Sequence, residues 1–127
     1  MGVEGGGRPP QEFTLALYYD LPVFKDVYKL TLRVFELTQH FAREYKFTLG
    51  QDMKRDCLSL VRSIYRAHKT QHKEVPLETF LDDFEVLKLE IRLCTDLKLL
   101  PIRNQAELAE LMEGISKQVT GWRNAHR

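Results

Sequence analysis

The stretch from Phe80 to Leu100 constrains the fold most, because it carries apolar residues on two opposite sides of one helix. Helical spacing places a first apolar stripe on one face: Phe80, Phe84, Leu87, Ile91 and Cys94. A second stripe falls on the opposite side: Val86, Leu89, Leu93 and Leu97. A surface helix of a monomeric bundle needs only one apolar face. Either this helix is central within its own chain, or the second stripe is a subunit interface, which is the interpretation we favour.

Length and composition indicate one soluble globular domain. The chain has 127 residues, of which 43% are hydrophobic and 29% are charged, so it can bury a core without disulfides or metals. It contains no run of about 18 apolar residues, so no membrane span is expected. Cys57 and Cys94 each lie in an apolar stripe, where a small buried side chain is the expected role. Free thiols suit a reducing, cytoplasmic location.

The first 19 residues are expected to precede the folded domain. Residues 1–10 are rich in glycine and proline and predict a flexible tail. The segment Glu12–Tyr19 alternates apolar residues, which suits a short arm that packs on a bundle. Residues 20–127 then form the domain.

Four helices of roughly 20 residues are expected within residues 20–127. An acidic cap and a proline in Asp20–Pro22 open the first helix, and Thr48–Gln51 has the capping-box pattern for the second. Pro76 marks the break before the third helix, and Asn104–Glu107 resembles the cap of the fourth. Short connections between such helices predict an all-α fold, the antiparallel up-down-up-down four-helix bundle.

Helical spacing also assigns inward faces to the other helices. The predicted inward face of the first helix includes Tyr28 and Phe35 together with Val27 and Val34. The fourth helix has a single apolar face that ends at Trp122, which is expected to be either a core residue or an interface anchor.

Charge is strongly divided along the chain, although the net charge is only +1. Residues 54–73 contain six Lys or Arg and one Asp, whereas residues 74–90 contain six Asp or Glu and one Lys. A cationic row projects from the outer side of the second helix, provided that the helix continues far enough: Arg55, Arg62, Arg66, Lys69 and Lys73. Three interpretations are open: a solvated face, a face paired with the acidic half of the third helix, or a phosphate-binding face. We favour phosphates, because guanidinium groups match phosphate geometry.

Catalytic and metal-binding patterns are absent from the sequence, and no cofactor is expected. There is no glycine-rich phosphate loop, and the Glu-x-x-His pattern of di-metal bundles is missing. Arg62 with His68 and Arg66 with His72 have the spacing of the HEPN helical ribonucleases, which is a loose pattern. On a continuous helix the two side chains of each pair point about 120° apart and would not converge on one phosphate. A ribonuclease is therefore only a minor alternative.

Several sequence blocks resemble the accessory variability determinant proteins of diversity-generating retroelements. These blocks are REYKFTLG (Arg43–Gly50), LKLEIRLCTDLKLL (Leu87–Leu100) and SKQVTGW (Ser116–Trp122), with LPVFK (Leu21–Lys25) at the first helix. The resemblance covers roughly Leu21–Arg123. The wider group of four-helix bundles includes proteins encoded by intervening sequences of bacterial 23S rRNA genes.

The resemblance implies a non-catalytic adaptor that assembles into a homopentameric barrel with a positively charged surface. Such proteins associate with the reverse transcriptase of the retroelement, bind RNA or DNA, and support error-prone copying that diversifies a target gene. It also implies phosphate contacts at Lys88 and Arg92, although an internal ion-pair ladder with Glu85 and Asp96 is equally open. The near-neutral net charge favours an additional contact between the acidic helix and a basic polymerase. A bundle of the intervening-sequence type, with a scaffolding role, is the main alternative.

Overall fold

The structure, a computed structural model, describes residues 19–127, and these contain four long helices, one short helix and no strand. The helices are α3 (Pro22–Thr38), α4 (Arg43–Lys46), α5 (Leu49–Lys69), α6 (Glu74–Asp96) and α7 (Ile102–Ala125). The predicted tail and nearly all of the predicted arm lie outside the described residues.

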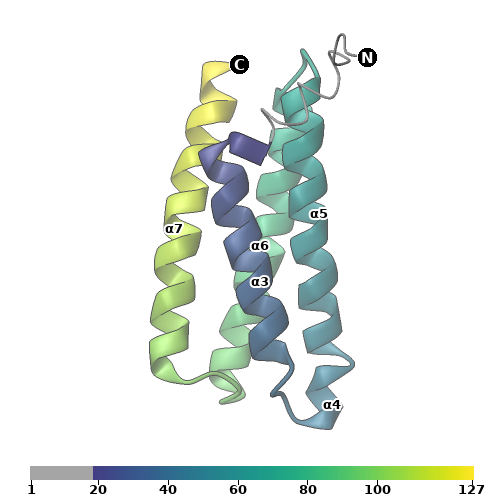
Figure 1. The fold of residues 1–127 in the computed structure, drawn as a ribbon, viewed down its shortest axis with the longest axis vertical. Helices are drawn as coiled ribbons and strands as arrows, with labels where there is room; N and C mark the ends of the chain where they lie inside the picture. The colour runs from purple at the N-terminus through teal and green to yellow at the C-terminus, as the bar shows by residue number, and fades with distance from the viewer. Residues whose placement is uncertain (1–18) are drawn as a thin grey trace, which may run out of the picture.

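The four long helices form an antiparallel bundle in which each helix packs against two neighbours (Figure 1). The principal contacts join α3 to α5, α5 to α6, α6 to α7, and α7 back to α3, so α3 and α6 occupy diagonal corners. The chain end after α7 lies at the same end of the bundle as the start of α3 (Figure 1). The predicted all-α, four-helix architecture is therefore confirmed for the single subunit.

Each long helix contributes one buried stripe to the core. In α6 the buried stripe is the first of the two predicted, with Phe80, Leu87 and Cys94 fully buried and Ile91 half-buried. Burial of one large aliphatic or aromatic side chain contributes about 1.5–3 kcal/mol to folding. The inner stripe of α6 is therefore a main source of the stability of the bundle.

The connection between α3 and α5 is tight because Gly50 lies directly against the end of α3. A Cβ atom at Gly50 would lie 3.3 Å from Thr38 Cβ and 3.3 Å from the Tyr45 carbonyl oxygen. A larger residue would push the first turn of α5 away from α3, which gives a steric reason for the glycine of the FTLG block. Gly121 in the TGW block has open space around it, so steric crowding does not explain that glycine.

Several predicted helix starts differ from the observed ones. Thr48 is the N-cap of α5, but its Oγ1 donates a 2.7 Å hydrogen bond to the Glu44 carbonyl and does not cap the helix. Asn104 lies within the first turn of α7 and does not cap it either. Pro76 lies inside the first turn of α6 and not before the helix. A backbone N–H in the first turn has no partner within the helix, so its absence in proline has no cost at this position.

Candidate functional site

The outer stripe of α6, defined as Val86, Leu89, Leu93 and Leu97, is uncovered in the described part of the chain. These four side chains are 50%, 60%, 42% and 41% exposed, respectively. A row of exposed aliphatic side chains along one helix is the kind of patch that marks an interaction site. Because the bundle formed by residues 19–127 covers only the inner stripe, α6 is not a fully central helix within this described part of the chain.

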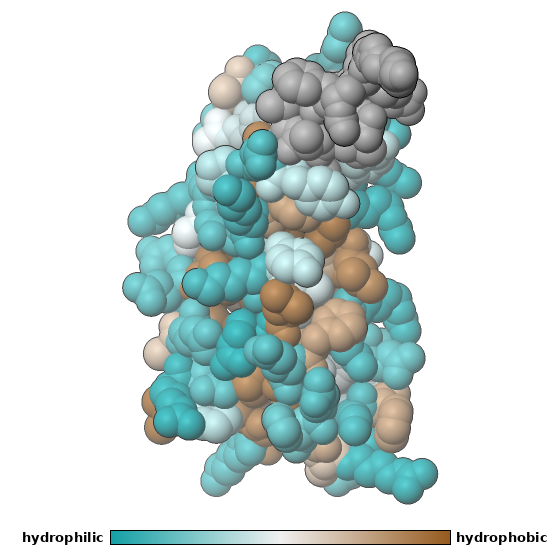
Figure 2. Space-filling view, in the orientation of Figure 1, coloured by the Kyte–Doolittle hydropathy of each residue, from teal (hydrophilic) through white to brown (hydrophobic). Residues whose placement is uncertain are grey.

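A second exposed apolar patch lies on the seam between α3 and α5. We call this the α3/α5 patch and define it by four side chains with exposures between 37% and 53%: Tyr28, Leu32, Phe35 and Leu58. Hydrophobic side chains gather along this seam in Figure 2. The inward positions predicted for Tyr28 and Phe35 are wrong, because both side chains lie roughly 80–100° from the centre of the buried stripe of α3. Lys54 covers one of them, with Nζ 5.5 Å from the centroid of the Phe35 ring.

The cationic row of α5 is shorter than the sequence predicts. Arg62, Arg66 and Lys69 are exposed on its outer side. Arg55 is exposed too, and its guanidinium lies 3.3 Å from the carboxylate of Asp52. Because α5 ends at Lys69, the row has four members.

Lys73, the fifth predicted member of the row, caps α5 instead. Its Nζ donates hydrogen bonds to the carbonyl oxygens of Ala67 at 2.7 Å, His68 at 3.3 Å and Thr70 at 2.8 Å. The last carbonyl groups of a helix have no partners within the helix, and a lysine ammonium both satisfies them and compensates the negative end of the helix dipole. We therefore assign Lys73 a structural role.

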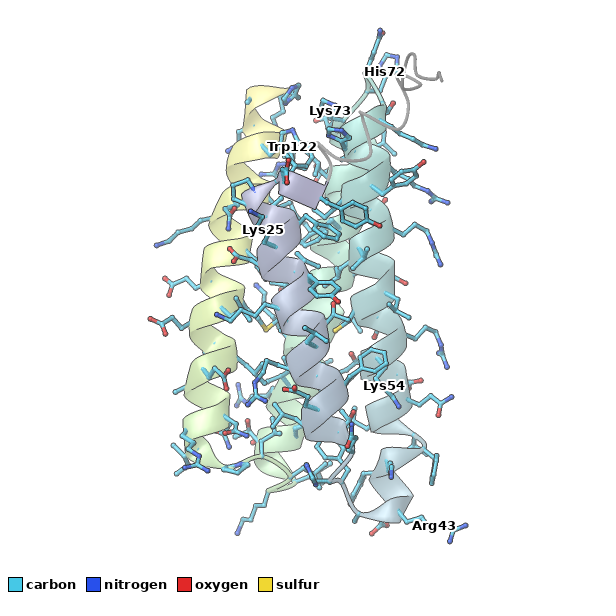
Figure 3. The ribbon with its side chains drawn as sticks, in the orientation of Figure 1. Lys25, Arg43, Lys54, His72, Lys73 and Trp122 are labelled. Carbon is cyan, nitrogen blue, oxygen red and sulfur yellow. The ribbon has the colours of Figure 1, made fainter. Side chains whose placement is uncertain are left out.

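Trp122, the predicted interface anchor on α7, is half-buried and packs against the core of its own bundle. Its ring centroid lies 5.9 Å from Lys73 Nζ, at the end of the bundle that Figure 3 shows with both residues labelled. The neighbouring Arg123 reaches across to α6 and pairs with Glu78 at 3.0 Å. Of the two predicted roles of Trp122, the structure supports the core role.

Lys88 and Arg92 each have an ion-pair partner on α6. Lys88 Nζ lies 2.6 Å from the carboxylate of Glu85, and the guanidinium of Arg92 lies 3.7 Å from that of Asp96. This is the predicted ladder. Exposed pairs of this kind contribute only about 0–1 kcal/mol, so both cations can exchange their partner for another anion at little cost.

A groove between α6 and α7 runs beside Lys88 and Arg92. Its volume is about 490 Å³, and Ile91 and Met112 contribute apolar wall. Ala109 leaves space on the α7 side of the groove. The two cations therefore border an apolar groove, an arrangement that suits a ligand with both a charged and an apolar part.

A pocket of about 420 Å³ lies where α5 ends and α6 begins. Its lining combines three basic residues, three residues with a hydroxyl group and two apolar residues: Ser63, Arg66, Lys69, Thr70, His72, Val75, Pro76 and Thr79. Arg66 and His72 thus meet at one pocket, although a continuous helix would separate them. They do so because α5 ends between them and the chain turns.

Glu90 is a buried carboxyl group that sequence reasoning missed. Only 8% of the residue is exposed, and its Oε1 has no hydrogen-bond partner among the described residues. Burial raises the pKa of Glu90 well above its ordinary value, and hydrogen bonding to Asp56 and the charges of Asp56 and Asp52 raise it further. Burial also raises the pKa of Asp83, which lies on α6 as well. The spacing of Glu90, three residues after Leu87 and four before Cys94, was the signal that it lies at the edge of the inner stripe.

Metal-binding and thiol chemistry find no support in residues 19–127. This part of the chain has no group of three or more His, Cys, Asp or Glu side chains placed to hold a metal ion. Cys57 and Cys94 are buried, and burial raises the pKa of both thiols to about 12, which disfavours the reactive thiolate. Among the described residues, every helix is too short or too polar to cross a membrane.

Comparison with protein-family models matches residues 23–126 to the family described as bAvd-like. The match spans all four long helices almost completely. The comparison with curated proteins found no match.

Proposed function

Because this chain belongs to the bAvd-like family of accessory variability determinants, we propose that it is a non-catalytic accessory protein of a diversity-generating retroelement. In this role it assembles as a ring, binds the reverse transcriptase, and holds template RNA or its cDNA during mutagenic copying. The observation that carries the proposal is the family match across residues 23–126. The two uncovered apolar patches and the cationic side chains beside them support it.

Assembly is supported by the presence of two different apolar patches on one subunit. The outer stripe of α6 and the α3/α5 patch differ in their residues and lie on different sides of the bundle. Two unlike patches that bind each other make a head-to-tail contact, and such contacts close into rings when the rotation between subunits allows it. The proposed number of five subunits comes from the family resemblance.

The test of assembly uses one pair of variants for each patch. Sedimentation of the wild-type chain should show an oligomer. The variants Leu89→Ser/Leu93→Ser and Leu32→Ser/Leu58→Ser should each give folded monomers, because all four side chains are exposed. A mixture of the two variants should form heterodimers, since each retains one intact patch. The control is Ile102→Ser, which removes an 82% exposed side chain outside both patches and should leave the oligomer intact.

A contact between α6 and itself across a two-fold axis would give a different result. The Leu32→Ser/Leu58→Ser variant would then dimerise on its own, the Leu89→Ser/Leu93→Ser variant would stay monomeric, and mixing the two would give no heterodimer. A wild-type chain that stays a folded monomer at micromolar concentration would remove the proposed ring altogether.

Nucleic-acid binding in the proposed assembly uses six exposed cations: Arg55, Arg62, Arg66, Lys69, Lys88 and Arg92. A ring repeats each of them around its axis, so the local field adds up although the net charge of one chain is only +1. With six cations engaged at one site, the slope of log affinity against log salt concentration should be about −4 to −5, from roughly 0.7–0.9 per contact. A salt-independent affinity would contradict electrostatic binding.

The proposed contact with the reverse transcriptase uses the acidic first half of α6. Glu78 already pairs with Arg123 of α7, and Glu74 pairs with Arg127, which follows that helix. Asp82 is exposed and has no ion pair among the described residues. A pull-down with the reverse transcriptase encoded beside the gene should retain the wild-type chain, and Asp82→Lys should reduce retention. No retention of the wild-type chain would argue against this partner.

A ribonuclease is the second candidate, and the shared pocket of Arg66 and His72 favours it over other enzymes. Incubation with RNA separates the two functions. Cleavage by the wild-type chain that is lost in His72→Ala would overturn the non-catalytic proposal. A scaffold of the intervening-sequence type would instead be indicated by a gene neighbourhood without a reverse transcriptase and template repeat.

A further inference from the structure

The pocket between the end of α5 and the start of α6 concentrates positive charge. Its volume is about 420 Å³, within the roughly 300–1,000 Å³ range of small-ligand sites. Arg66, Lys69 and His72 line it, and its described lining includes no carboxylate. The remaining polar lining consists of the hydroxyl groups of Ser63, Thr70 and Thr79. Thr79 already donates to the Val75 carbonyl oxygen, whereas the hydroxyl groups of Ser63 and Thr70 can donate hydrogen bonds to an anion.

The negative end of α5 is neutralised beside the pocket, which favours an anion there. The last carbonyl groups of a helix carry partial negative charge and would repel a phosphate. Here the ammonium of Lys73 occupies three of these carbonyl oxygens. The backbone N–H of His72 donates a 3.2 Å hydrogen bond to Thr70 Oγ1, which fixes the turn that brings His72 to the pocket. The local structure thus removes negative charge and adds a ring N–H donor.

Arg66 is the side chain best placed to hold a phosphate. It is exposed at the pocket and makes no ion pair with any residue between 19 and 127. By contrast, Arg33 and Arg123 each hold a carboxylate at 2.9 Å and 3.0 Å. A guanidinium group can donate two parallel hydrogen bonds to phosphate oxygens, and such bonds are stronger than those between neutral groups.

We propose that this pocket is a phosphate-binding site that takes one phosphodiester group of an RNA strand. Arg66 binds the phosphate in a bidentate manner, Lys69 adds charge at the rim, and His72 donates from its ring. The apolar side chains of Val75 and Pro76 line the wall along which the attached sugar lies. The proposal rests on the proposed function, because it names a part of the surface that holds a phosphate of the template strand.

The experiment measures binding of a short oligouridylate to the full chain by fluorescence anisotropy, with amide chemical shifts recorded in parallel. The oligouridylate should shift the amide signals of Thr70, His72 and Thr79. Arg66→Ala should weaken binding about tenfold or more. Arg66→Lys keeps the positive charge but loses the paired N–H donors of the guanidinium, so its affinity should lie between those of the wild type and Arg66→Ala. The control is Arg43→Ala, because Arg43 is also exposed and has no ion pair among the described residues, but lies outside both the pocket and the proposed set of binding cations. That variant should weaken binding of the oligouridylate by about threefold or less.

Equal losses in Arg43→Ala and Arg66→Ala would overturn the proposal, because the charge alone would then explain binding. The same titration with inorganic phosphate separates the two sources of a phosphate group. Shifts of the pocket amides with phosphate but not with the oligouridylate would overturn the assignment to RNA and, separately, remove support for the proposed function. Binding of the oligouridylate with no shift in the pocket would leave the proposed function intact and overturn the pocket alone.

Discussion

The two sides of α6 have similar side chains and opposite surroundings. Leu87 on the inner stripe is fully buried, whereas Leu89 and Leu93 on the outer stripe are 60% and 42% exposed. The three leucines lie within seven residues of one another on the same helix. Their difference shows that the bundle uses only half of the apolar surface of α6, and that the remaining half is available to another molecule.

The border between the two sides is marked by Glu90. It lies at the edge of the inner stripe, close to Asp52 and Asp56 of α5, and its Oε1 has no hydrogen-bond partner among the described residues. A buried polar atom without a partner costs about 1–3 kcal/mol. The inner side therefore contains one unfavourable group, and the comparison between the sides can be tested residue by residue.

The largest effect is expected from Leu87→Ala on the inner side. Removing a fully buried leucine side chain leaves a cavity in the core and should lower the free energy of unfolding by about 2–5 kcal/mol. Chemical denaturation followed by circular dichroism measures this change. A loss below about 0.5 kcal/mol, the size typical of surface substitutions, would show that the inner stripe is not the packed side.

The next largest effect is expected at the border, from Glu90→Gln. Because the pKa of Glu90 is raised in the folded chain, the folded state binds more protons than the unfolded state between the ordinary and the raised pKa. The wild-type stability contributed by this group is present below the ordinary pKa, about 4.3, and is lost as pH rises through the raised value. Glutamine cannot ionise, so the variant should be about 1–3 kcal/mol more stable than wild type at alkaline pH.

Unfolding of Glu90→Gln and wild type across a pH series measures this difference. The stabilisation should shrink as the pH falls. Glu85→Gln is the control, because Glu85 is an exposed carboxylate on the same helix and its substitution should not remove the pH dependence. An unchanged pH dependence in Glu90→Gln would assign it to Asp83 instead, whose pKa burial also raises.

A smaller effect is expected from Leu93→Ala on the outer side. In a dissociated subunit this exposed side chain makes few packing contacts, so the free energy of unfolding should change by about 0.5 kcal/mol or less. The effect should grow when the protein concentration is high enough for assembly, because partner binding adds to apparent stability. Denaturation at two protein concentrations tests this, and a large loss at the lower one would mean that the outer side is already packed within one subunit.

The smallest effect is expected from Arg92→Ala, on the charged strip that separates the two sides. Its side chain is 76% exposed and its pair with Asp96 spans one helical turn at 3.7 Å. Such a pair contributes about 0.3–0.5 kcal/mol. The same variant should weaken RNA binding and lower the salt slope by roughly one contact, about 0.7–0.9. Normal binding would remove Arg92 from the proposed surface.

Much of the fold follows from spacing in the sequence. The inner and outer stripes of α6 are readable because apolar residues recur at steps of three and four. The same reasoning failed for Tyr28 and Phe35, because a helical wheel gives the direction of a side chain around its own axis and not the position of the neighbouring helix. It also suggested caps at Thr48 and Asn104, where polar residues near a helix start use other partners or none.

The candidate site was less predictable than the fold, because it depends on where α5 ends. The prediction that Lys73 joins the cationic row assumed a longer helix, and the separation of Arg66 from His72 assumed the same. Ending α5 at Lys69 turns Lys73 into a cap and brings Arg66 and His72 to one pocket. Glu90 was hidden for a different reason, since the charge of a residue suggests exposure whatever its position in a stripe.

The two buried cysteines allow opening of the bundle to be measured by thiol alkylation. Cys57 on α5 and Cys94 on α6 have no exposed surface, and Cys94 Sγ lies 3.5 Å from Met53 Sδ inside the core. A maleimide can reach either thiol only after the helices separate, so the alkylation rate counts how often the bundle opens. If both thiols are labelled in one step, α5 and α6 separate together. Assembly into a ring should lower the alkylation rate of both thiols, which can be followed without an added label site.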